Sequence, residues 1–414
     1  MKPGVFKESI LFGRGLSSEL YPNSKNTMTE LQKPEFPKQI ISLNLRSLDA
    51  LRGFLAIYVL AGHCRWLLWI GNIGWSQYPH SWYAEILVYA SASLRYGHEA
   101  VIIFFVLSGF FIHLRVSKQL AQSKTFQLNI RNFFHRRCHR LVPPYILALA
   151  LTTILDLVGR FLYPILYTSL TGDLLLDQNF LRKGFSVASV LPALFMLPSS
   201  MGKDFGSNGP LWSLAYEVIY YLLYPLWLKI RYFGALPAYG TGVIVAALGQ
   251  LFFMPSFATQ VLIHYPIWLS GALIAEMISQ KKLIFTKTNI WASGLLLLVA
   301  FLATHLTLAS PLLILVYAVL GSTVVLLITS LPLSICQHPV HKYFEILGIE
   351  SYTIYICHFP IITFISAWAF EVLDGRPAHG FLALGGGLFT LLVCHILFVL
   401  CERYFLHSRL KIND

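Results

Sequence analysis

The sequence of 414 residues is poor in charge. Asp, Glu, Lys and Arg together make up 12% of it, whereas 56% of the residues are hydrophobic and the mean hydropathy is +0.63. A soluble domain carries about 25% charged residues and about 45–50% apolar ones. This deficit of charge excludes an ordinary soluble domain. It predicts an all-α polytopic membrane protein, because a helix satisfies its own backbone hydrogen bonds in lipid.

Several motifs of soluble enzymes and metalloproteins are also missing. The sequence has no HExxH, no GxxxxGK[ST] and no carboxylate cluster suited to a metal, and its six cysteines form no CxxC pair. The pairs His98–Glu99 and His135–His139 are weak metal signals, because no further ligands accompany them. We therefore expect no metal cofactor and no disulfide framework, and the thiols are predicted to be free and mostly buried.

The net charge of +12 has two explanations in a membrane protein. Cytoplasmic loops are rich in Lys and Arg, and basic groups contact anionic lipid or a phosphorylated ligand. Basic and aromatic residues do not alternate in any soluble module of this sequence, so nucleic acid is not an expected partner. The membrane lipid itself is.

Apolar runs long enough to cross a bilayer follow one another along the chain. A span needs about 20 mostly apolar residues. Ten segments are predicted to be transmembrane helices: 48–69, 97–115, 141–163, 209–230, 235–254, 258–280, 289–308, 311–331, 348–371 and 380–402. The run 187–198 is too short to span and is predicted to be an interfacial or re-entrant piece of a long loop.

The distribution of Lys and Arg predicts how these spans are oriented. With the N-terminal tail in the cytoplasm, the basic loop 115–140 and the cations near 230, 282, 342 and 409 fall on the same side, as the positive-inside rule requires. Both termini are then cytoplasmic, and no secretory signal opens the sequence. The predicted organisation is a polar tail at 1–46, a transmembrane domain at 47–405 and a short tail at 406–414.

Arg52 and His63 both lie in the first predicted span. They are eleven residues apart, which is three helical turns plus about 20°, so they share one helix face at an axial separation of about 16 Å. One face thus offers a cation near the cytoplasmic surface and an imidazole at depth, which suits a ligand with an anionic head and an inward-reaching reactive end. In the alternative, Arg52 reaches lipid headgroups and His63 makes a helix–helix hydrogen bond.

Two further ionisable groups are predicted at a similar depth. Glu217 lies about 12 Å into the span 209–230, where a buried carboxylate needs His63, His358 or an arginine as partner, or forms a purely structural ion pair. His358 lies near the middle of the span 348–371. Pro360 beside it is expected to loosen the helix and free backbone groups. His358 serves as a second acid–base or acceptor-binding group, or simply packs.

A basic cluster stands at the cytoplasmic entry of the third span. Arg136, Arg137 and Arg140 lie within about one helical turn, and three guanidinium groups at one entry suit phosphate or pyrophosphate. The alternative is that they set the topology and contact lipid phosphates. Ser108, in FFVLSGFF, is interpreted as a packing residue, because a Ser–Gly pair lets helices approach closely.

Five segments in series resemble the acyltransferase-three family of integral-membrane acyltransferases. They are LRGFLAIYVLAGH with Arg52 and His63, FFVLSGFF, RRCHRLVPPY, NGPLWSLAYE and SYTIYICHFP. The resemblance runs from about 45 to 405 in the family's order. Two departures are Ala100, where Gly is common, and the sequence Glu402–Arg403–Tyr404, where the family often has Glu-x-Pro.

This resemblance implies transfer of an acyl group, commonly acetyl from acetyl-CoA, to a hydroxyl of an extracytoplasmic or lipid-linked glycan such as O-antigen. A small-molecule hydroxyl, such as that of a macrolide, is the alternative acceptor. The implied location is the bacterial inner membrane. The expected residue roles are as follows: catalysis by His63 as general base with Glu217 orienting it; donor binding by Arg52, Arg136, Arg137 and Arg140; and substrate binding by His358, Tyr355, Trp212 and Ser213. An acyl-histidine intermediate and direct transfer both remain open.

The rival class is a proton-coupled secondary transporter or flippase, since buried His and Glu in many spans also suit a proton-coupled carrier. No internal repeat is visible in the sequence, whereas many transporters show one. The cytoplasmic arginine cluster paired with His63 also favours the acyltransferase.

Overall fold

The computed structural model describes residues 45–71, 82–123, 126–181, 184–252, 256–280, 287–306 and 310–407. These residues form helices and loops and contain no strand, which confirms the all-α prediction for the described ranges. The predicted tails at 1–46 and 406–414 lie almost wholly outside the described residues. The division of the chain into tail, membrane domain and tail therefore stays a prediction.

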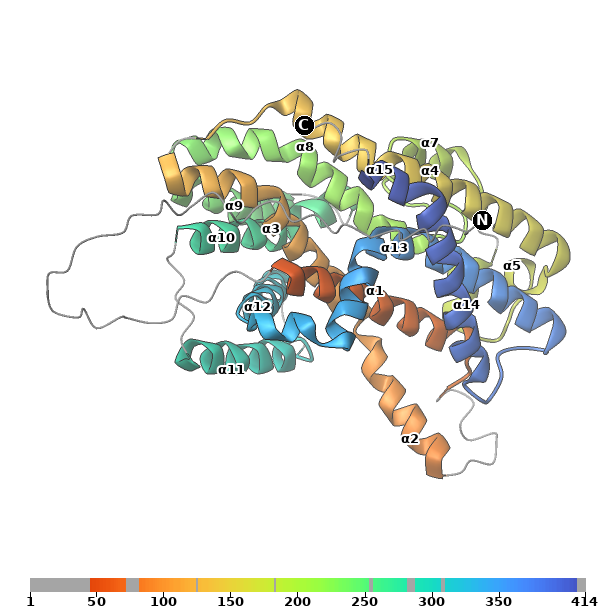
Figure 1. The fold of residues 1–414 in the computed structure, drawn as a ribbon. Coiled ribbons are helices and arrows are strands. Elements are labelled where there is room, and N and C mark those ends of the chain that lie inside the picture. Colours follow the sequence, from red (N-terminus) through yellow and green to blue (C-terminus); the bar gives the residue numbers. More distant parts are fainter. Residues whose placement is uncertain are drawn as a thin grey trace, which may run out of the picture. The chain divides into compact units, whose positions relative to one another are not determined.

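The helices follow one another along the chain, as Figure 1 shows. Their bounds are α1 Leu45–Leu68, α2 Trp82–Ser91, η2 Ala92–Arg95, α3 Gly97–Ser123, α4 Ile130–Leu162, α5 Ile165–Thr168, α6 Leu174–Phe180, α7 Val187–Leu194, η3 Gly209–Leu211, α8 Trp212–Tyr232, α9 Ala235–Phe252, α10 Phe257–Ser279, α11 Lys287–Ala303, α12 Ser310–Thr329, η4 Leu333–Gln337, α13 Pro339–Val372, α14 Phe381–Leu397, η5 Phe398–Glu402 and α15 Arg403–His407.

Each of the ten predicted spans coincides with a helix. Six helical stretches in the described ranges are long and apolar enough to cross a membrane: Glu85–Ser123, Ile130–Leu162, Phe257–Ser279, Leu312–Thr329, Pro339–Val372 and Phe381–Leu406. The apolar parts of α9 and α11 are shorter, and α1 and α8 carry the charged residues of the site described below. A helical protein with several candidate spans is thus confirmed. The count of ten and the side of each terminus stay predictions.

Helices α1 and α13 pack side by side and run in the same direction. Gly348 of α13 approaches the backbone of Asp49 so closely that a Cβ on this glycine would lie 1.9 Å from the Asp49 carbonyl oxygen. At the other end, Ser366 donates a hydrogen bond to the carbonyl oxygen of Leu67 over 2.9 Å. The contacts advance together along both chains, so the pair is parallel. The predicted alternating topology requires this of the first and ninth predicted spans.

Helices α3 and α10 form a second parallel pair, because Ser108 contacts Trp268 and, further along both helices, Ser117 contacts Ser279. A Cβ on Gly109 would lie 1.9 Å from the carbonyl oxygen of Trp268, and one on Gly271 would lie 1.9 Å from that of Val106. Small residues at the crossing let the two backbones meet, which is how helices pack in lipid. The packing role predicted for the Ser108–Gly109 pair is therefore met by Gly109.

The arginine cluster lies on a helix that begins earlier than predicted. The third span was expected at 141–163, but α4 starts at Ile130, where the side chain of Asn129 accepts a hydrogen bond from the backbone N–H of Asn132 over 3.0 Å. Helix α3 likewise continues to Ser123. The basic loop is thus largely helical, and its arginines are held at fixed positions on α4.

The long loop between α4 and α8 contains three short helices. One of them, α7 at Val187–Leu194, coincides with the predicted interfacial piece 187–198. The loop ends at Asn208, which is fully buried against α13. All six cysteines are free, and four of them, Cys64, Cys336, Cys357 and Cys394, are buried as predicted.

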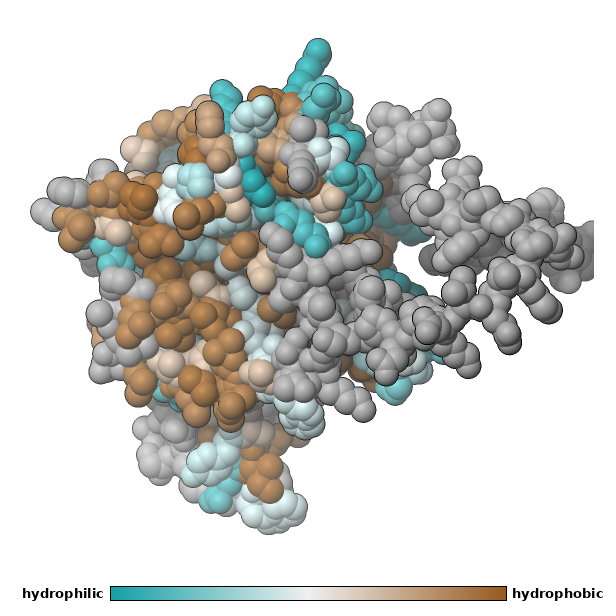
Figure 2. Space-filling model, turned by 90° about the vertical axis from the view of Figure 1, so that its left-hand side faces the viewer, coloured by the Kyte–Doolittle hydropathy of each residue, from teal (hydrophilic) through white to brown (hydrophobic). Residues whose placement is uncertain are grey.

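Many large apolar side chains remain exposed on the outer helices. Leu236, Val243 and Leu251 of α9 and Trp291 and Leu295 of α11 are each at least 64% exposed. Figure 2 shows that apolar residues dominate much of one face, while hydrophilic residues gather toward one end of it. Exposed apolar helices of this kind suit contact with lipid chains.

Candidate functional site

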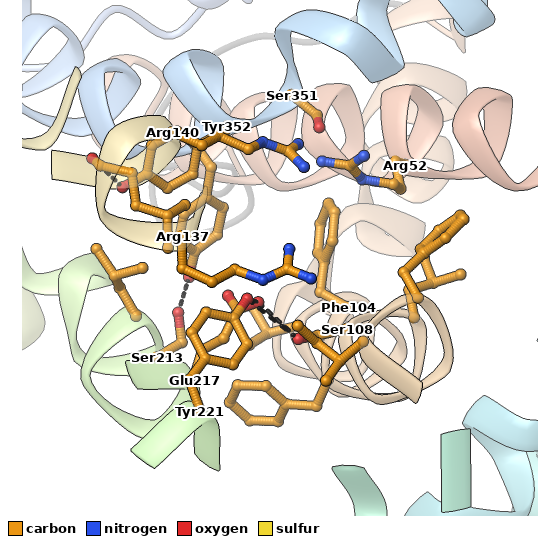
Figure 3. A pocket seen from close by; sticks show the side chains of 18 of the residues that line it. Arg52, Phe104, Ser108, Arg137, Arg140, Ser213, Glu217, Tyr221, Ser351 and Tyr352 are labelled. Carbon is orange, nitrogen blue, oxygen red and sulfur yellow. Dashed lines mark hydrogen bonds between the residues drawn. The ribbon is translucent and has the colours of Figure 1, made fainter. Parts of the chain in front are cut away.

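A cavity of about 380 Å³ opens among α1, α3, α4, α8 and α13. Three arginines line it, Arg52 from α1 and Arg137 and Arg140 from α4. Figure 3 shows that the guanidinium groups of Arg52 and Arg140 point toward each other and that Arg137 reaches into the same space. Arg52 reaches the cavity from α1. Arg137 and Arg140 reach it from α4, which starts early enough to include both of them. Helix α13, which packs parallel to α1, lines the same cavity.

The three guanidinium groups are only partly compensated by nearby carboxylates. Arg52 lies 3.6 Å from a carboxylate oxygen of Asp49. Arg137 stands over the rings of Phe133 and Tyr221, 5.6 Å from each centroid, an arrangement that stabilises a cation without occupying its N–H donors. The Nε atom of Arg140 is buried and has no hydrogen-bond partner among the residues that the structure describes. This surplus of donors and positive charge suits an anionic ligand with several acceptor oxygens.

Glu217 lies in the same cavity and has different partners from those expected. Its Oε1 atom accepts a 2.6 Å hydrogen bond from Ser108 and a very short one from Tyr221. Ser108 in turn accepts a 3.1 Å hydrogen bond from the indole N–H of Trp268. The expected orientation of His63 by Glu217 is therefore not what the structure shows, because the carboxylate is held among α3, α8 and α10. Ser108, which was interpreted as a packing residue, also forms hydrogen bonds with Glu217 and Trp268.

The last two predicted residues in the cavity are Ser213 and Tyr355. Their hydroxyl oxygens are 2.6 Å apart, and Tyr355 also donates to the carbonyl oxygen of Pro210 over 3.1 Å. These bonds tie the start of α8 to the middle of α13. Ser213 is buried, and both side chains line the cavity, so this hydroxyl pair is a polar part of its lining.

His63 and His358 form a pair next to Tyr355. Their ring centroids are 5.3 Å apart, and the His358 ring lies 6.1 Å from that of Tyr355. The Nδ1 atom of His358 lies 2.9 Å and 2.8 Å from the carbonyl oxygens of Ile354 and Tyr355. Carbonyl oxygens only accept, so Nδ1 carries the proton and Nε2 of the neutral ring is an acceptor. That Nε2 atom is buried and has no partner in the described part of the chain.

The remaining predicted residues lie outside the cavity. Arg136 is half-buried on α4 but does not line it. Trp212 packs in a ring cluster with His98 and Tyr216, at centroid distances of 6.1 Å and 5.0 Å. The four arginines predicted to bind the acyl donor therefore do not all lie in one site. Arg52, Arg137 and Arg140 converge, and Arg136 stands apart.

Sequence reasoning missed the roles of Tyr221 and Asn208. Tyr221 is one helical turn after Glu217, a spacing that could have indicated the contact. Asn208 donates hydrogen bonds to Thr152 over 3.1 Å and to the carbonyl oxygen of Ile356 over 2.9 Å. Within the described ranges, no three His, Cys, Asp or Glu side chains gather closely enough to hold a metal ion.

A helical protein with several candidate membrane spans and a cavity lined by polar and charged side chains is compatible with a membrane enzyme. Comparison with protein families agrees, since a family model described as an acyltransferase domain matches residues 45–401. The chain belongs to the acyltransferase-three family. This confirms the resemblance inferred from the five sequence segments.

The chain is also similar to an uncharacterized protein of Haemophilus influenzae. The two are 32% identical over 135 residues, which is 31% of this chain and 49% of that protein, so the match spans about half of the relative's length. No solved structure matches the chain significantly.

Proposed function

We propose that this protein transfers an acyl group, acetyl from acetyl-CoA, to a hydroxyl of an extracytoplasmic or lipid-linked glycan. Family membership supports a membrane acyltransferase. The observation that carries the finer proposal is the convergence of three guanidinium groups in one cavity, whose lining residue Tyr355 lies 6.1 Å from His358 of the His63–His358 pair.

Coenzyme A is a polyanion, and the cavity has the chemistry to bind one. Arg52, Arg137 and Arg140 would hold its phosphates. The Nε–H group of Arg140 has no acceptor among the described residues, so it can donate a hydrogen bond to a phosphate oxygen. Each charge-assisted hydrogen bond to phosphate is worth about 1.5–3 kcal/mol. Arg136 lies outside the cavity lining, so we leave it out of this donor site.

The chemistry is assigned to His63, with His358 in the orienting role that the sequence had given to Glu217. A general base takes the proton of the acceptor hydroxyl as its oxygen attacks the thioester carbonyl carbon. The new ester bond forms, the carbon–sulfur bond breaks, and the proton on His63 passes to the departing thiolate. His358 supports this assignment, because its fixed Nδ1–H leaves Nε2 as an acceptor beside the His63 ring.

The proposed glycan acceptor is inferred from the family resemblance. We propose that the loop between α4 and α8 helps to form its binding site. This loop packs over the histidine pair through Phe180, whose ring lies 6.1 Å from those of Trp66 and Phe359. His63 stands 4.8 Å from Phe359 in the same cluster. We place the protein in a bacterial inner membrane, and the similarity to a protein of the bacterium Haemophilus influenzae supports the bacterial part of this proposal.

The test is an assay of the full-length protein in liposomes with acetyl-labelled acetyl-CoA, combined with mass spectrometry of surface glycans from cells with and without the gene. We expect release of free coenzyme A and a mass gain of one acetyl group, both lost in His63→Ala while insertion is normal. If His63→Ala kept nearly full activity, His63 would not be the general base. Solute accumulation without any use of acetyl-CoA would instead support the transporter.

A further inference from the structure

Glu402 is a buried carboxylate that the proposed reaction does not use. It is 0% exposed and lies at the end of η5, where the helix widens into a π-turn between α14 and α15. Single π-turns inside α-helices are rare and occur frequently at functional sites. The widened turn points this side chain inward rather than to the membrane.

One oxygen of this carboxylate is anchored and the other is free. The Oε2 atom accepts hydrogen bonds from the hydroxyl of Thr353 over 2.5 Å and from its backbone N–H over 3.2 Å. The Oε1 atom is buried and has no hydrogen-bond partner in the described residues. Burial and the unpaired oxygen make the ionised form of Glu402 costly, and positive charge nearby offsets part of that cost.

Two arginines that line the donor cavity supply positive charge of this kind. Arg140 and Arg52 both interact electrostatically with Glu402, although neither forms an ion pair within 4 Å of it. Tyr352, next to Thr353, lines the cavity and donates a 3.0 Å hydrogen bond to the carbonyl oxygen of Leu141, which follows Arg140. Two adjacent residues of α13 thus connect the carboxylate and the backbone beside Arg140.

We infer that Glu402 is a positioning residue for the donor site, a counter-charge behind Arg140 and Arg52 that keeps these like charges converged on the cavity. Because it stands back from the guanidinium groups, it offsets their mutual repulsion without occupying the N–H donors that a ligand needs. A direct ion pair would consume those donors. This inference rests on the proposed function, since it assumes an anionic donor in the cavity.

The test measures binding of labelled coenzyme A and the KM and kcat for acetyl-CoA, with the full-length protein in detergent micelles. Glu402→Gln keeps the shape and removes the charge. We expect about tenfold weaker binding and a similar rise in KM, the scale on which one partly buried charge acts on another, with kcat within about twofold of wild type. Loss of a merely structural residue would lower the yield of folded protein and leave KM unchanged.

Glu350→Gln is the matched control. Glu350 is also a buried carboxylate, 4% exposed, but it pairs with His395 over 3.0 Å and does not line the cavity. Its variant should bind coenzyme A as wild type does. Thr353→Val and Thr353→Ser form a second pair, in which only the valine variant, which lacks the hydroxyl, should weaken binding.

Each outcome decides between the two proposals. If wild type binds coenzyme A and both Glu402→Gln and Thr353→Val bind it equally well, the positioning role is overturned and the donor assignment stands. If Glu402→Gln does not fold, the Thr353 pair decides alone. If wild type binds no coenzyme A, the donor assignment and this inference fail together.

Discussion

Asn208 donates a 2.9 Å hydrogen bond to the carbonyl oxygen of Ile356, the group that Pro360 leaves without its helical donor. Proline has no backbone N–H, so the carbonyl four residues before it has no partner within the helix. Helix α13 nevertheless continues through Pro360 to Val372. Pro360 was predicted to free a backbone group near His358, and that group is the carbonyl of Ile356. Its hydrogen-bond donor is Asn208, which lies in the loop before α8.

This relationship predicts a coupled effect of two substitutions. Asn208→Ala should destabilise the protein by about 1–3 kcal/mol, because it leaves a buried carbonyl unsatisfied. In a Pro360→Ala background the new N–H restores the helical bond to Ile356, so the same Asn208 change should cost clearly less. Thermal or denaturant unfolding in detergent measures both costs. Equal costs in the two backgrounds would show that Asn208 does not act through this carbonyl.

The sequence predicted the helices and the chemistry-bearing residues better than it predicted their partners. Apolar runs indicated each span, and the 3.6-residue period placed Arg52 and His63 on one face of α1. The partner of Glu217 depends on how α3, α8 and α10 meet, and no local pattern encodes that meeting. Ser108 contacts both Glu217 of α8 and Trp268 of α10, beside the close crossing of α3 and α10 at Gly109.

Boundaries failed for a related reason. Hydropathy marks where a helix enters lipid, not where it begins, so it missed the stretch of α4 from Ile130 to Arg140. The local signal was the Asn129 cap, a residue type favoured at helix starts. Sequence analysis placed Arg136, Arg137 and Arg140 within about one helical turn and grouped them in one site, because spacing alone does not show which face of the helix lines the cavity.

The Ser108–Gly109 pair predicts two different kinds of damage from neighbouring alanines. Gly109→Ala should strongly reduce the yield of folded protein, because its Cβ would lie 1.9 Å from the Trp268 carbonyl oxygen and force α3 from α10. Ser108→Ala removes one hydrogen bond to Glu217 and should fold normally, costing about 0.5–1.5 kcal/mol and reducing activity. Size-exclusion profiles and acetyl-CoA turnover separate the two. A well-folded Gly109→Ala protein would argue against the close crossing.

A buried ionic network between α3, α8 and α10 predicts a loss of stability that spares the site. Glu276 accepts hydrogen bonds from Arg231, both 2.7 Å long, and lies 2.9 Å from Nε2 of His113. Glu276→Ala removes the carboxylate from Arg231 and from Nε2 of His113, which then keeps its Tyr224 contact at Nδ1, and should cost about 3–5 kcal/mol. None of the three lines the cavity, so the protein that still folds should keep the wild-type KM for acetyl-CoA. A raised KM in that fraction would show that the network also shapes the donor site.

The arginines of α4 provide the sharpest test of the donor site, because sequence and structure divide them differently. Arg137→Ala and Arg140→Ala should each raise the KM for acetyl-CoA about 10- to 100-fold, the cost of losing charge-assisted hydrogen bonds. Arg140→Lys should restore only part of the affinity, since an ammonium group cannot bind phosphate with a planar pair of donors. Arg136→Ala should leave KM within about twofold of wild type, because that side chain lies outside the cavity lining. Steady-state kinetics at fixed acceptor concentration measure all four variants. Equal effects at Arg136 and Arg140 would favour the sequence grouping, in which the whole cluster binds the donor, over the division that the cavity defines.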